Sequence, residues 1–213
     1  MPLTIDETLK LFSSMESIIT ENRQFLTDLD AAIGDGDHGI NMSKGFKAVS
    51  EKLHSASLSS WGDIFKITGM ALVSTVGGAS GPLYGTAFLK AAAVGTGKTE
   101  LSLSDFKAIL EAAINGIKMR GGADKGDKTM LDALMPALEA VNTGIKENLP
   151  YLEVLKSAYE AAAQGVEFTK TIAARKGRAS YLGDRSIGFQ DPGATSSCLL
   201  LKSVYEGVSS LRE

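Results

Sequence analysis

Three aspartates lie within eight positions at the start of residues 30–41, which read Asp-Ala-Ala-Ile-Gly-Asp-Gly-Asp-His-Gly-Ile-Asn. Carboxylates crowded in this way repel one another unless a cation neutralises them, and ligand sets made only of oxygen favour Mg²⁺, Mn²⁺ or Ca²⁺. The glycines let the backbone turn tightly, and a helix that starts beyond them would offer free amides to an anion. The segment therefore suggests a site for a metal and a phosphate. The plainer alternative is an acidic turn that caps a helix, although one aspartate suffices for a cap.

Two familiar motifs fit this segment only superficially. Residues 34–39 match the G-x-G-x-x-G pattern of dinucleotide-binding folds, but that fingerprint follows a strand, and the residues before it have helical periodicity. The spacing of Asp35 and Asp37 is similar to that of a calcium-binding EF-hand loop. The twelfth position from Asp35 is Phe46, however, where that loop needs glutamate. Neither motif explains the segment.

Helices are expected on both sides of the acidic segment. Apolar residues recur at helical spacing from Phe25 to Ile33, so Asp30 should lie near the end of a helix. A second helical pattern begins at Ile40 and continues to Leu53. The aspartates thus belong to a corner between two helices.

Two later segments interrupt the helical pattern with glycine. Residues 77–85 contain four glycines and Ser80, and Pro82 suits the first turn of a following helix. A simple connection between helices rarely needs so many glycines, so we favour a cradle of backbone amides for a phosphate or a base. Residues 120–130 combine glycine with charge, and their composition leaves a flexible solvated loop and a binding loop equally open.

A third segment, residues 174–196, carries four cations in eleven residues before the turn that begins the last helix. Such cations could neutralise the phosphates of a nucleotide. The alternative is a helix C-terminus, where the helix dipole favours positive charge. That alternative accounts well for Arg175 and Lys176 but poorly for Arg178 and Arg185.

The composition argues against several classes of protein. With 213 residues, 44% of them hydrophobic, the chain is long enough to bury a substantial core. A net charge of −3 without a large basic run argues against nucleic acid as a partner. No segment is long and apolar enough to span a membrane, and no secretory signal is visible, so we expect a cytoplasmic protein. The single cysteine, Cys198, lies in an apolar run and is expected to pack in the core.

Helical periodicity recurs along the chain, and no alternating stretch makes a convincing strand. We therefore expect one all-α domain over residues 1–213, with eight or so amphipathic helices, one of them covering about residues 152–174. The special segments fall at helix ends, after about residues 33, 77, 120 and 177. Successive helices joined by short loops pack antiparallel, so alternate junctions lie at the same end of the bundle. Several of these loops can then meet around one ligand.

Together, the four segments resemble the nucleotide-binding L subunit of dihydroxyacetone kinase. The resemblance covers nearly the whole chain and keeps four motifs in the order of that family. It implies a closed barrel of eight antiparallel amphipathic helices, with nucleotide and magnesium at one rim. It also implies that Asp30, Asp35 and Asp37 are ligands of two Mg²⁺ ions, which bridge these carboxylates to the phosphates of ADP or ATP.

The resemblance further implies which residues contact the nucleotide, Arg178 being the cationic contact. In this sequence they are His38, Gly39, Ile40, Asn41, Ala79, Ser80, Gly121, Met130, Arg178, Asp191, Pro192 and Gly193. The sequence departs from the family pattern at none of these positions.

The function implied by the resemblance needs partners. In that family the L subunit passes phosphoryl from its nucleotide to dihydroxyacetone, which a separate K subunit holds through its own histidine. Neither His38 nor His54 matches that role, so this chain is expected to supply half of an active site. A phosphohistidine M subunit, fed by the phosphotransferase system, converts ADP back to ATP in place, which makes the nucleotide a tightly bound coenzyme.

Two alternatives remain open at this level. One is a kinase subunit that uses exchangeable ATP and acts on dihydroxyacetone or on a related ketose such as erythrulose. The other is a non-catalytic nucleotide sensor that binds a transcriptional regulator. Both would need the same nucleotide loops, so the sequence alone does not separate them from the first reading.

Overall fold

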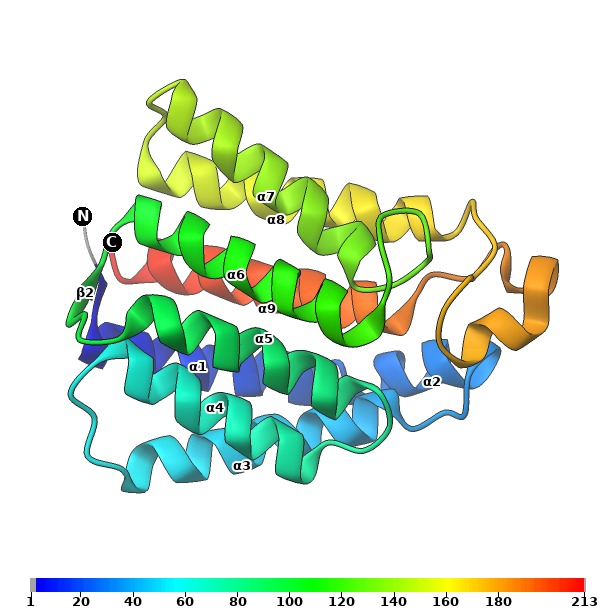
Figure 1. Ribbon diagram of the computed structural model, residues 1–213, viewed down its shortest axis with the longest axis horizontal. Coiled ribbons are helices and arrows are strands. Elements are labelled where there is room, and N and C mark those ends of the chain that lie inside the picture. Colours follow the sequence, from blue (N-terminus) through cyan, green and yellow to red (C-terminus); the bar gives the residue numbers. More distant parts are fainter. Residues whose placement is uncertain (1–2, 213) are drawn as a thin grey trace.

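The computed structural model describes residues 3–212, which form nine α-helices, one 3₁₀-helix and two short strands (Figure 1). The α-helices are α1 (Ile5–Glu21), α2 (Arg23–Ile33), α3 (His38–Ser55), α4 (Trp61–Thr75), α5 (Ser80–Gly95), α6 (Leu103–Gly121), α7 (Leu131–Lys146), α8 (Tyr151–Thr169) and α9 (Pro192–Ser210). The 3₁₀-helix η1 spans Arg178–Ser186, and the strands are β1 (Leu3–Thr4) and β2 (Glu100–Leu101). The predicted all-α class is confirmed.

Eight of the described helices contact one another in a circuit. Helix α1 packs on α3, α3 packs on α4, each helix from α4 onward packs on the next, and α9 returns to α1. Neighbours in this circuit run in opposite directions, so the start of α1 and the end of α9 lie at one end of the molecule (Figure 1). The other end, here called the site end, collects the junctions α2–α3, α4–α5, α6–α7 and α8–α9. These junctions contain the four special segments, as antiparallel packing predicts.

Side-chain caps fix where several helices begin. The amide of Glu7 donates to Thr4 Oγ1 at 3.3 Å while the amide of Thr4 donates to Glu7 Oε2 at 2.8 Å, which completes a capping box. Helix α9 also begins with a side-chain cap, because the amide of Ala194 donates to Asp191 Oδ2 at 2.7 Å. Pro192 occupies the first turn of this helix. Asp191 is therefore held at the site end of α9.

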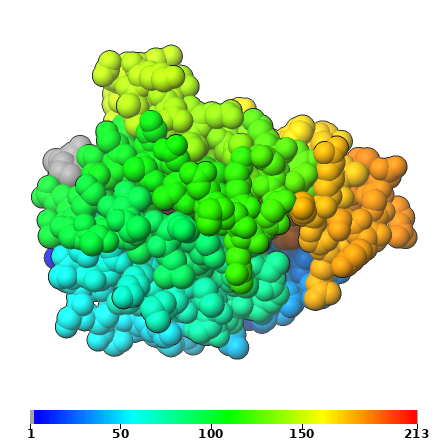
Figure 2. Space-filling model, viewed as in Figure 1, coloured from blue at the N-terminus to red at the C-terminus, as the bar shows by residue number. Residues whose placement is uncertain are grey.

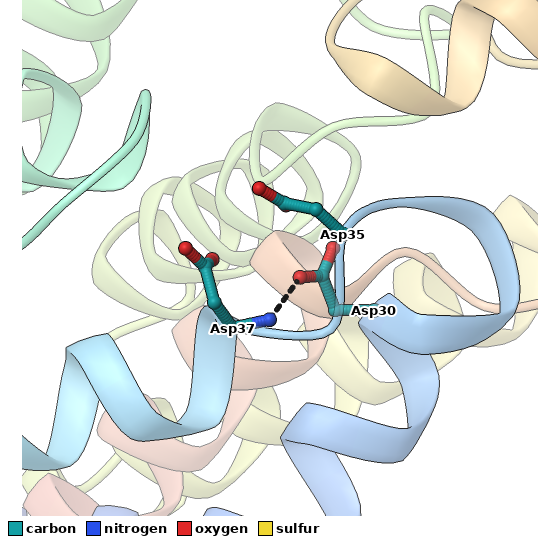
Figure 3. Close-up of side chains that lie close together, drawn as sticks. All are labelled: Asp30, Asp35 and Asp37. Carbon is teal, nitrogen blue, oxygen red and sulfur yellow. Dashed lines mark hydrogen bonds between the residues drawn. The ribbon is translucent and has the colours of Figure 1, made fainter.

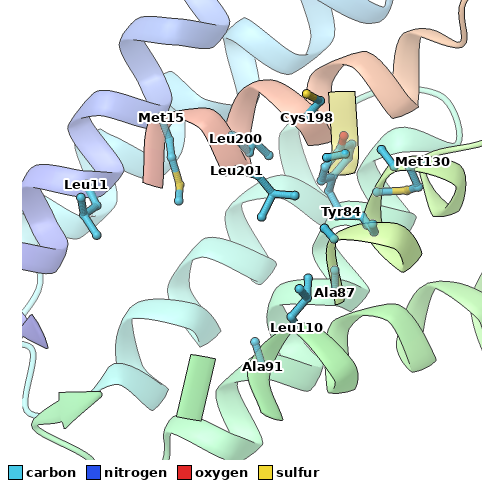
Figure 4. Close-up of a cluster of buried hydrophobic side chains, with 14 of the residues drawn as sticks. Leu11, Met15, Tyr84, Ala87, Ala91, Leu110, Met130, Cys198, Leu200 and Leu201 are labelled. Atoms are coloured by element: carbon cyan, nitrogen blue, oxygen red, sulfur yellow. The ribbon is translucent and has the colours of Figure 1, made fainter. Parts of the chain in front are cut away.

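The helices surround one continuous apolar core, part of which Figure 4 shows. Side chains such as Leu11 of α1, Leu110 of α6 and Leu201 of α9 meet there, around a residual cavity of about 150 Å³. Trp61 is 5% exposed and Cys198 is 8% exposed. The expected packing of Cys198 in the core is thus confirmed.

Local structure differs from the sequence-based expectations in small ways. Strands β1 and β2 pair antiparallel, with Leu3 opposite Leu101, and are too short to leave an alternating pattern. Helix α8 ends at Thr169 instead of near residue 174, and the carbonyl of Thr169, which a longer helix would use itself, accepts a hydrogen bond from the side chain of Lys128. Among residues 3–212, no helix combines the length and the apolarity that crossing a membrane requires.

The two ends of the described chain are joined by an ion pair between Glu7 Oε1 and Arg212 Nη1 at 2.7 Å. The Thr4 amide and the Arg212 guanidinium together hold the pKa of Glu7 at about 2, well below its usual 4.5. A carboxyl whose pKa is lower in the folded state stabilises the fold at pH values above its unfolded pKa. That contribution is lost as the pH falls from 4.5 toward about 2.

Glu7→Gln is therefore expected to lower the melting temperature at pH 7 and to matter progressively less toward pH 3. Thermal unfolding followed by circular dichroism at a series of pH values measures the difference from the unmodified protein. Glu51→Gln, an exposed position within α3, is the matched control and should change little at any pH. If Glu7→Gln lowers the melting temperature equally at pH 7 and pH 3, the stabilisation does not depend on a lowered pKa of Glu7.

Candidate metal and nucleotide site

The acidic segment forms the corner between α2 and α3, and Asp30 lies in the last turn of α2. The residue is only 9% exposed, and its Oδ2 accepts from the amide of Asp37 at 2.9 Å (Figure 3) and from the amide of His38 at 3.2 Å. The free amides at the start of α3 thus orient the Asp30 carboxylate. Gly34 ends α2, and a Cβ atom at that position would overlap Asp30 Oδ1. A side chain at residue 34 would therefore displace the Asp30 carboxylate.

The three predicted metal ligands come together. Asp30, Asp35 and Asp37 each offer a carboxylate oxygen, and these oxygens lie within 4.8 Å of one another. Figure 3 shows the three side chains on the same side of the loop that joins α2 to α3. A compact set of charged oxygen ligands fits a hard divalent cation such as Mg²⁺. The chemistry of the donor set therefore agrees with the metal that the resemblance implies.

A cation from elsewhere in the chain faces the same cluster. Arg178 Nη2 lies 2.9 Å from Asp35 Oδ2, and the two side chains are 63% and 37% exposed. Arg178 begins η1, so this ion pair links the acidic corner to the segment after α8. Because both groups are substantially exposed, the pair is expected to contribute little to the stability of the fold. The guanidinium remains available to an anion next to the metal ligands.

A pocket of about 340 Å³ opens at the site end and brings the four special segments together. In Figure 2 a hollow is visible between the orange segment around η1 and the green surface beside it. Eleven of the predicted site residues line the pocket: Asp30, Asp35, His38, Ala79, Ser80, Gly121, Met130, Arg178, Asp191, Pro192 and Gly193. Loops far apart in the sequence thus line one pocket.

Four predicted site residues do not line this pocket. Asp37 belongs to the carboxylate cluster, while Gly39, Ile40 and Asn41 continue the first turn of α3. Gly39 is buried against α2, and Ile40 is 43% exposed. Their roles as nucleotide contacts stay predictions.

The sequence of this chain matches a known protein family. The family model described as the DAK2 domain matches residues 32–206, which is most of the chain. The chain belongs to the DAK2 domain family. The matched range contains the acidic corner from residue 32 onward and all three later segments, and it begins just after Asp30.

Relatives of this DAK2 domain include subunits of similar size. It is 42% identical over 202 residues to the "PEP-dependent dihydroxyacetone kinase, ADP-binding subunit DhaL" of Escherichia coli (strain K12), covering 95% of this chain and 96% of the relative. It is 39% identical over 209 residues to the "PTS-dependent dihydroxyacetone kinase, ADP-binding subunit DhaL" of Lactococcus lactis subsp. lactis, covering 97% of this chain and 100% of the relative.

A solved structure with the same fold is that of the dihydroxyacetone kinase from C. freundii in complex with AMP-PNP and Mg²⁺. It superposes with a TM-score of 0.71 and 27% identity. The match covers 97% of this chain but 34% of the C. freundii chain, so this DAK2 domain spans about a third of that longer kinase.

The floor of the pocket in this DAK2 domain is a buried polar network that sequence reasoning did not find. His38 Nδ1 lies 3.1 Å from Ser80 Oγ, and His38 Nε2 lies 2.8 Å from Ser196 Oγ. The Tyr84 hydroxyl lies 2.7 Å from Ser196 Oγ and 2.8 Å from Ser197 Oγ. The network joins the starts of α3, α5 and α9. It also separates the pocket from the apolar core, which Tyr84 lines on its other side.

Burial determines the pKa values of two titratable side chains at the base of the pocket, His38 and Asp191. It lowers the pKa of His38 to about 4, against the opposing charge of Asp30, so the imidazole is neutral at pH 7. His38 therefore acts through hydrogen bonds and not through charge. Burial also raises the pKa of Asp191 to about 7, an effect that the hydrogen bond from the Ala194 amide partly offsets.

Two further residues of this DAK2 domain shape the loop 120–130. Asp132 is 1% exposed and accepts from the amides of Gly126 at 2.5 Å and Thr129 at 2.8 Å. Lys128, in the middle of the loop, is also 1% exposed. Hydrogen bonds to Asp132 and the burial of Lys128 thus fix the second half of the loop, which favours a binding loop over a flexible solvated one. A signal in the sequence was the spacing of Asp132 from Thr129, which is typical of a helix cap.

Proposed function

We propose that this chain is the ADP-binding subunit of a dihydroxyacetone kinase. In this proposal it passes phosphoryl from a nucleotide in the site-end pocket to dihydroxyacetone held on a separate K subunit. The observation that carries the proposal is the convergence of three carboxylates and Arg178 at the mouth of one pocket. Identity of 42% to an ADP-binding subunit over nearly the full length of both chains supports it.

In this proposal, some residues of the site bind the metal and others bind the phosphates. Asp30, Asp35 and Asp37 would hold Mg²⁺, two ions in our proposal, and the metal would screen the charge of the phosphoryl group. Arg178 would meet phosphate oxygens beside them. In phosphoryl transfer most of the catalysis is positioning and charge neutralisation, so no further catalytic side chain of this chain is required.

The starts of two helices support phosphate binding. Ser80 begins α5 and Gly193 lies in the first turn of α9, and both line the pocket. Amides at helix starts have no partner within the helix and attract anions. Ala79, Gly121 and Met130 would complete the nucleotide contacts from the neighbouring loops.

A partner must supply the ketose site in this proposal. Both ring nitrogens of His38 are engaged by serine hydroxyls, and Nδ1 of His54 lies 2.7 Å from the carbonyl of Ser50 on exposed α3 surface away from the pocket. Neither histidine is placed to hold dihydroxyacetone covalently. We therefore propose a K subunit that carries dihydroxyacetone, and a phosphohistidine M subunit that rephosphorylates bound ADP in the cytoplasm. One domain over residues 1–213 is sufficient for this role.

Mg²⁺ with ADP is expected to raise the melting temperature, and EDTA to lower it. A ligand that binds only the folded state at 100 times its Kd stabilises it by about 2.7 kcal/mol. For a chain of this size each kcal/mol corresponds to roughly 2–4 °C, so we expect a shift of about 5–10 °C. Thermal unfolding with metal content checked by atomic absorption measures it, and Asp35→Asn is the control that should respond weakly. An EDTA-treated, metal-free protein with an unchanged melting curve would argue against the site.

The function is tested by reconstitution. The purified chain, a K subunit and dihydroxyacetone are combined with ATP, or with phosphoenolpyruvate, the phosphotransferase proteins and an M subunit. We expect dihydroxyacetone phosphate to form with the second donor system and to require all subunits. Efficient turnover with free ATP alone would favour a kinase subunit with exchangeable ATP. Faster transfer to erythrulose than to dihydroxyacetone would identify erythrulose as the substrate. Absence of transfer with every donor would favour a sensor that binds a regulator.

A further inference from the structure

The side chain of Lys128 ends in a cage of backbone oxygens. Its Nζ donates to the carbonyls of Thr169 and Ser186 at 2.7 Å each, and to that of Phe189 at 2.5 Å. The carbonyl of Ile172 lies 3.3 Å away. An ammonium has three N–H donors, so these oxygens occupy all of them. Lys128 therefore has no donor left for a phosphate, although it lies at the edge of the pocket.

The oxygens that Lys128 contacts all belong to one region. They lie at the end of α8, just after α8, at the end of η1 and just before α9. The intervening residues 170–190, here called the arm, extend beyond the helices at the site end (orange in Figure 1). Arg178 and its ion pair with Asp35 belong to the arm, and Asp191 follows it directly.

Besides the Lys128 cage and the Arg178–Asp35 ion pair, few contacts connect the arm to the rest of the protein. The amide of Arg175 donates to the carbonyl of Asp127 at 3.1 Å, and the amide of Asp191 donates to Thr169 Oγ1 at 2.9 Å. A small apolar cluster, separate from the main core, joins Ile33 of α2 to the arm through Ala174 and Ala179. With so little apolar burial, the Lys128 cage is the main polar connection between the arm and the loop 120–130.

The backbone conformation of Lys128 is one that a lysine adopts only at a cost, which indicates that the position is occupied by lysine for the sake of its side chain. Its φ is 60°, in the left-handed region that glycine adopts freely and other residues adopt at a cost. Asp132 holds the loop in this conformation through the Gly126 and Thr129 amides. The loop thus accepts an unfavourable residue there, and that residue directs an ammonium into the arm.

We propose that Lys128 is a positioning residue, whose ammonium fixes the arm so that Arg178 stands beside the metal cluster and Asp191 at the pocket wall. The inference rests on the proposed nucleotide site for its effect on binding. Its structural part, that Lys128 holds the arm in place, does not depend on any ligand.

The test compares Lys128→Met with Lys125→Met, an exposed lysine of the same loop whose Nζ lies 3.4 Å from Glu139. Trypsin is applied to the folded proteins without nucleotide, well below their melting temperatures, and cleavage is mapped at the arm sites Lys170, Arg175, Lys176, Arg178 and Arg185. We expect cleavage in the arm to accelerate at least about 10-fold in Lys128→Met only, which is about 1.4 kcal/mol of local opening. Should Lys128→Met fail to fold, Lys128→Gln removes the charge and keeps two donors.

Isothermal titration with Mg²⁺ and ADP then tests how Lys128 acts. We expect Lys128→Met to weaken ADP binding at least about 10-fold in the unmodified background, and by a clearly smaller factor when Arg178→Ala is already present, because part of its effect passes through Arg178. A folded Lys128→Met with unchanged cleavage in the arm would overturn the inference, as would effects of the two substitutions that simply add. If the unmodified protein does not bind ADP, the proposed function fails, whereas the cleavage experiment still decides whether Lys128 holds the arm.

Discussion

Asp37→Asn is expected to lower phosphoryl transfer about 10²–10³-fold, the loss typical of removing one electrostatic group from a reacting centre. The substitution keeps the shape of the side chain and removes one of the three charges that face the metal position. The Asp37 side chain does not cap α3, so the change leaves no helix amide without its partner. Folding should therefore be nearly unaffected, and the melting temperature without metal should stay within a few degrees.

The measurement is the initial rate of dihydroxyacetone phosphate formation with saturating K subunit at two Mg²⁺ concentrations. Asp28→Asn is the matched control, because Asp28 is an exposed aspartate of α2 that accepts a hydrogen bond from Gln24 outside the cluster. High Mg²⁺ should recover part of the rate in Asp37→Asn. Near-normal transfer by Asp37→Asn at both concentrations would show that this carboxylate is not a metal ligand.

Gly39→Ala is expected to destabilise the fold by about 1–3 kcal/mol, the usual range for overpacking, and to weaken metal binding with it. A Cβ atom at residue 39 would overlap the carbonyl oxygen of Arg23 and lie 2.8 Å from the amide nitrogen of Thr27. Both are backbone atoms of α2, so the strain can be relieved only by moving α2 away from α3. These two helices carry Asp30 and Asp37, so the metal ligands would separate.

Urea denaturation gives the free energy of unfolding, and titration with Mg²⁺ and ADP gives the affinity. Lys44→Ala, an exposed position in α3, serves as the control for a change in the same helix. A Gly39→Ala protein with normal stability and normal affinity would mean that the contact between α2 and α3 is looser than the structure indicates.

Local sequence signals predicted the helices and the acidic corner well. The periodicity from Phe25 to Ile33 placed Asp30 near a helix end, and it lies in the last turn of α2. Charge crowding pointed to the three aspartates, whose oxygens meet within 4.8 Å. These features depend on neighbours in the chain, which periodicity and composition report directly.

Features that depend on distant contacts were not predicted. The Tyr84 hydroxyl meets Ser196 across 112 positions, and nothing near either residue indicates the other. Lys128 looked like one charge among several in a glycine-rich loop, yet the fold buries it in carbonyls contributed by a segment more than forty positions away. The same contact occupies the carbonyl of Thr169, where α8 ends earlier than the alanine-rich sequence indicates. Long-range packing decided these details.

In the proposed function, phosphoryl passes from nucleotide held by this chain to a ketose held by a partner. The most direct test loads the chain with ATP labelled in its γ-phosphoryl and removes free nucleotide. The K subunit, dihydroxyacetone and a large excess of unlabelled ATP are then added together. If the nucleotide leaves slowly compared with transfer, about one labelled phosphoryl per chain should appear in dihydroxyacetone phosphate in a single burst, undiluted by the excess. Product labelled only to the extent of the mixed ATP pool, or no labelled product at all, would contradict transfer from nucleotide that this chain retains.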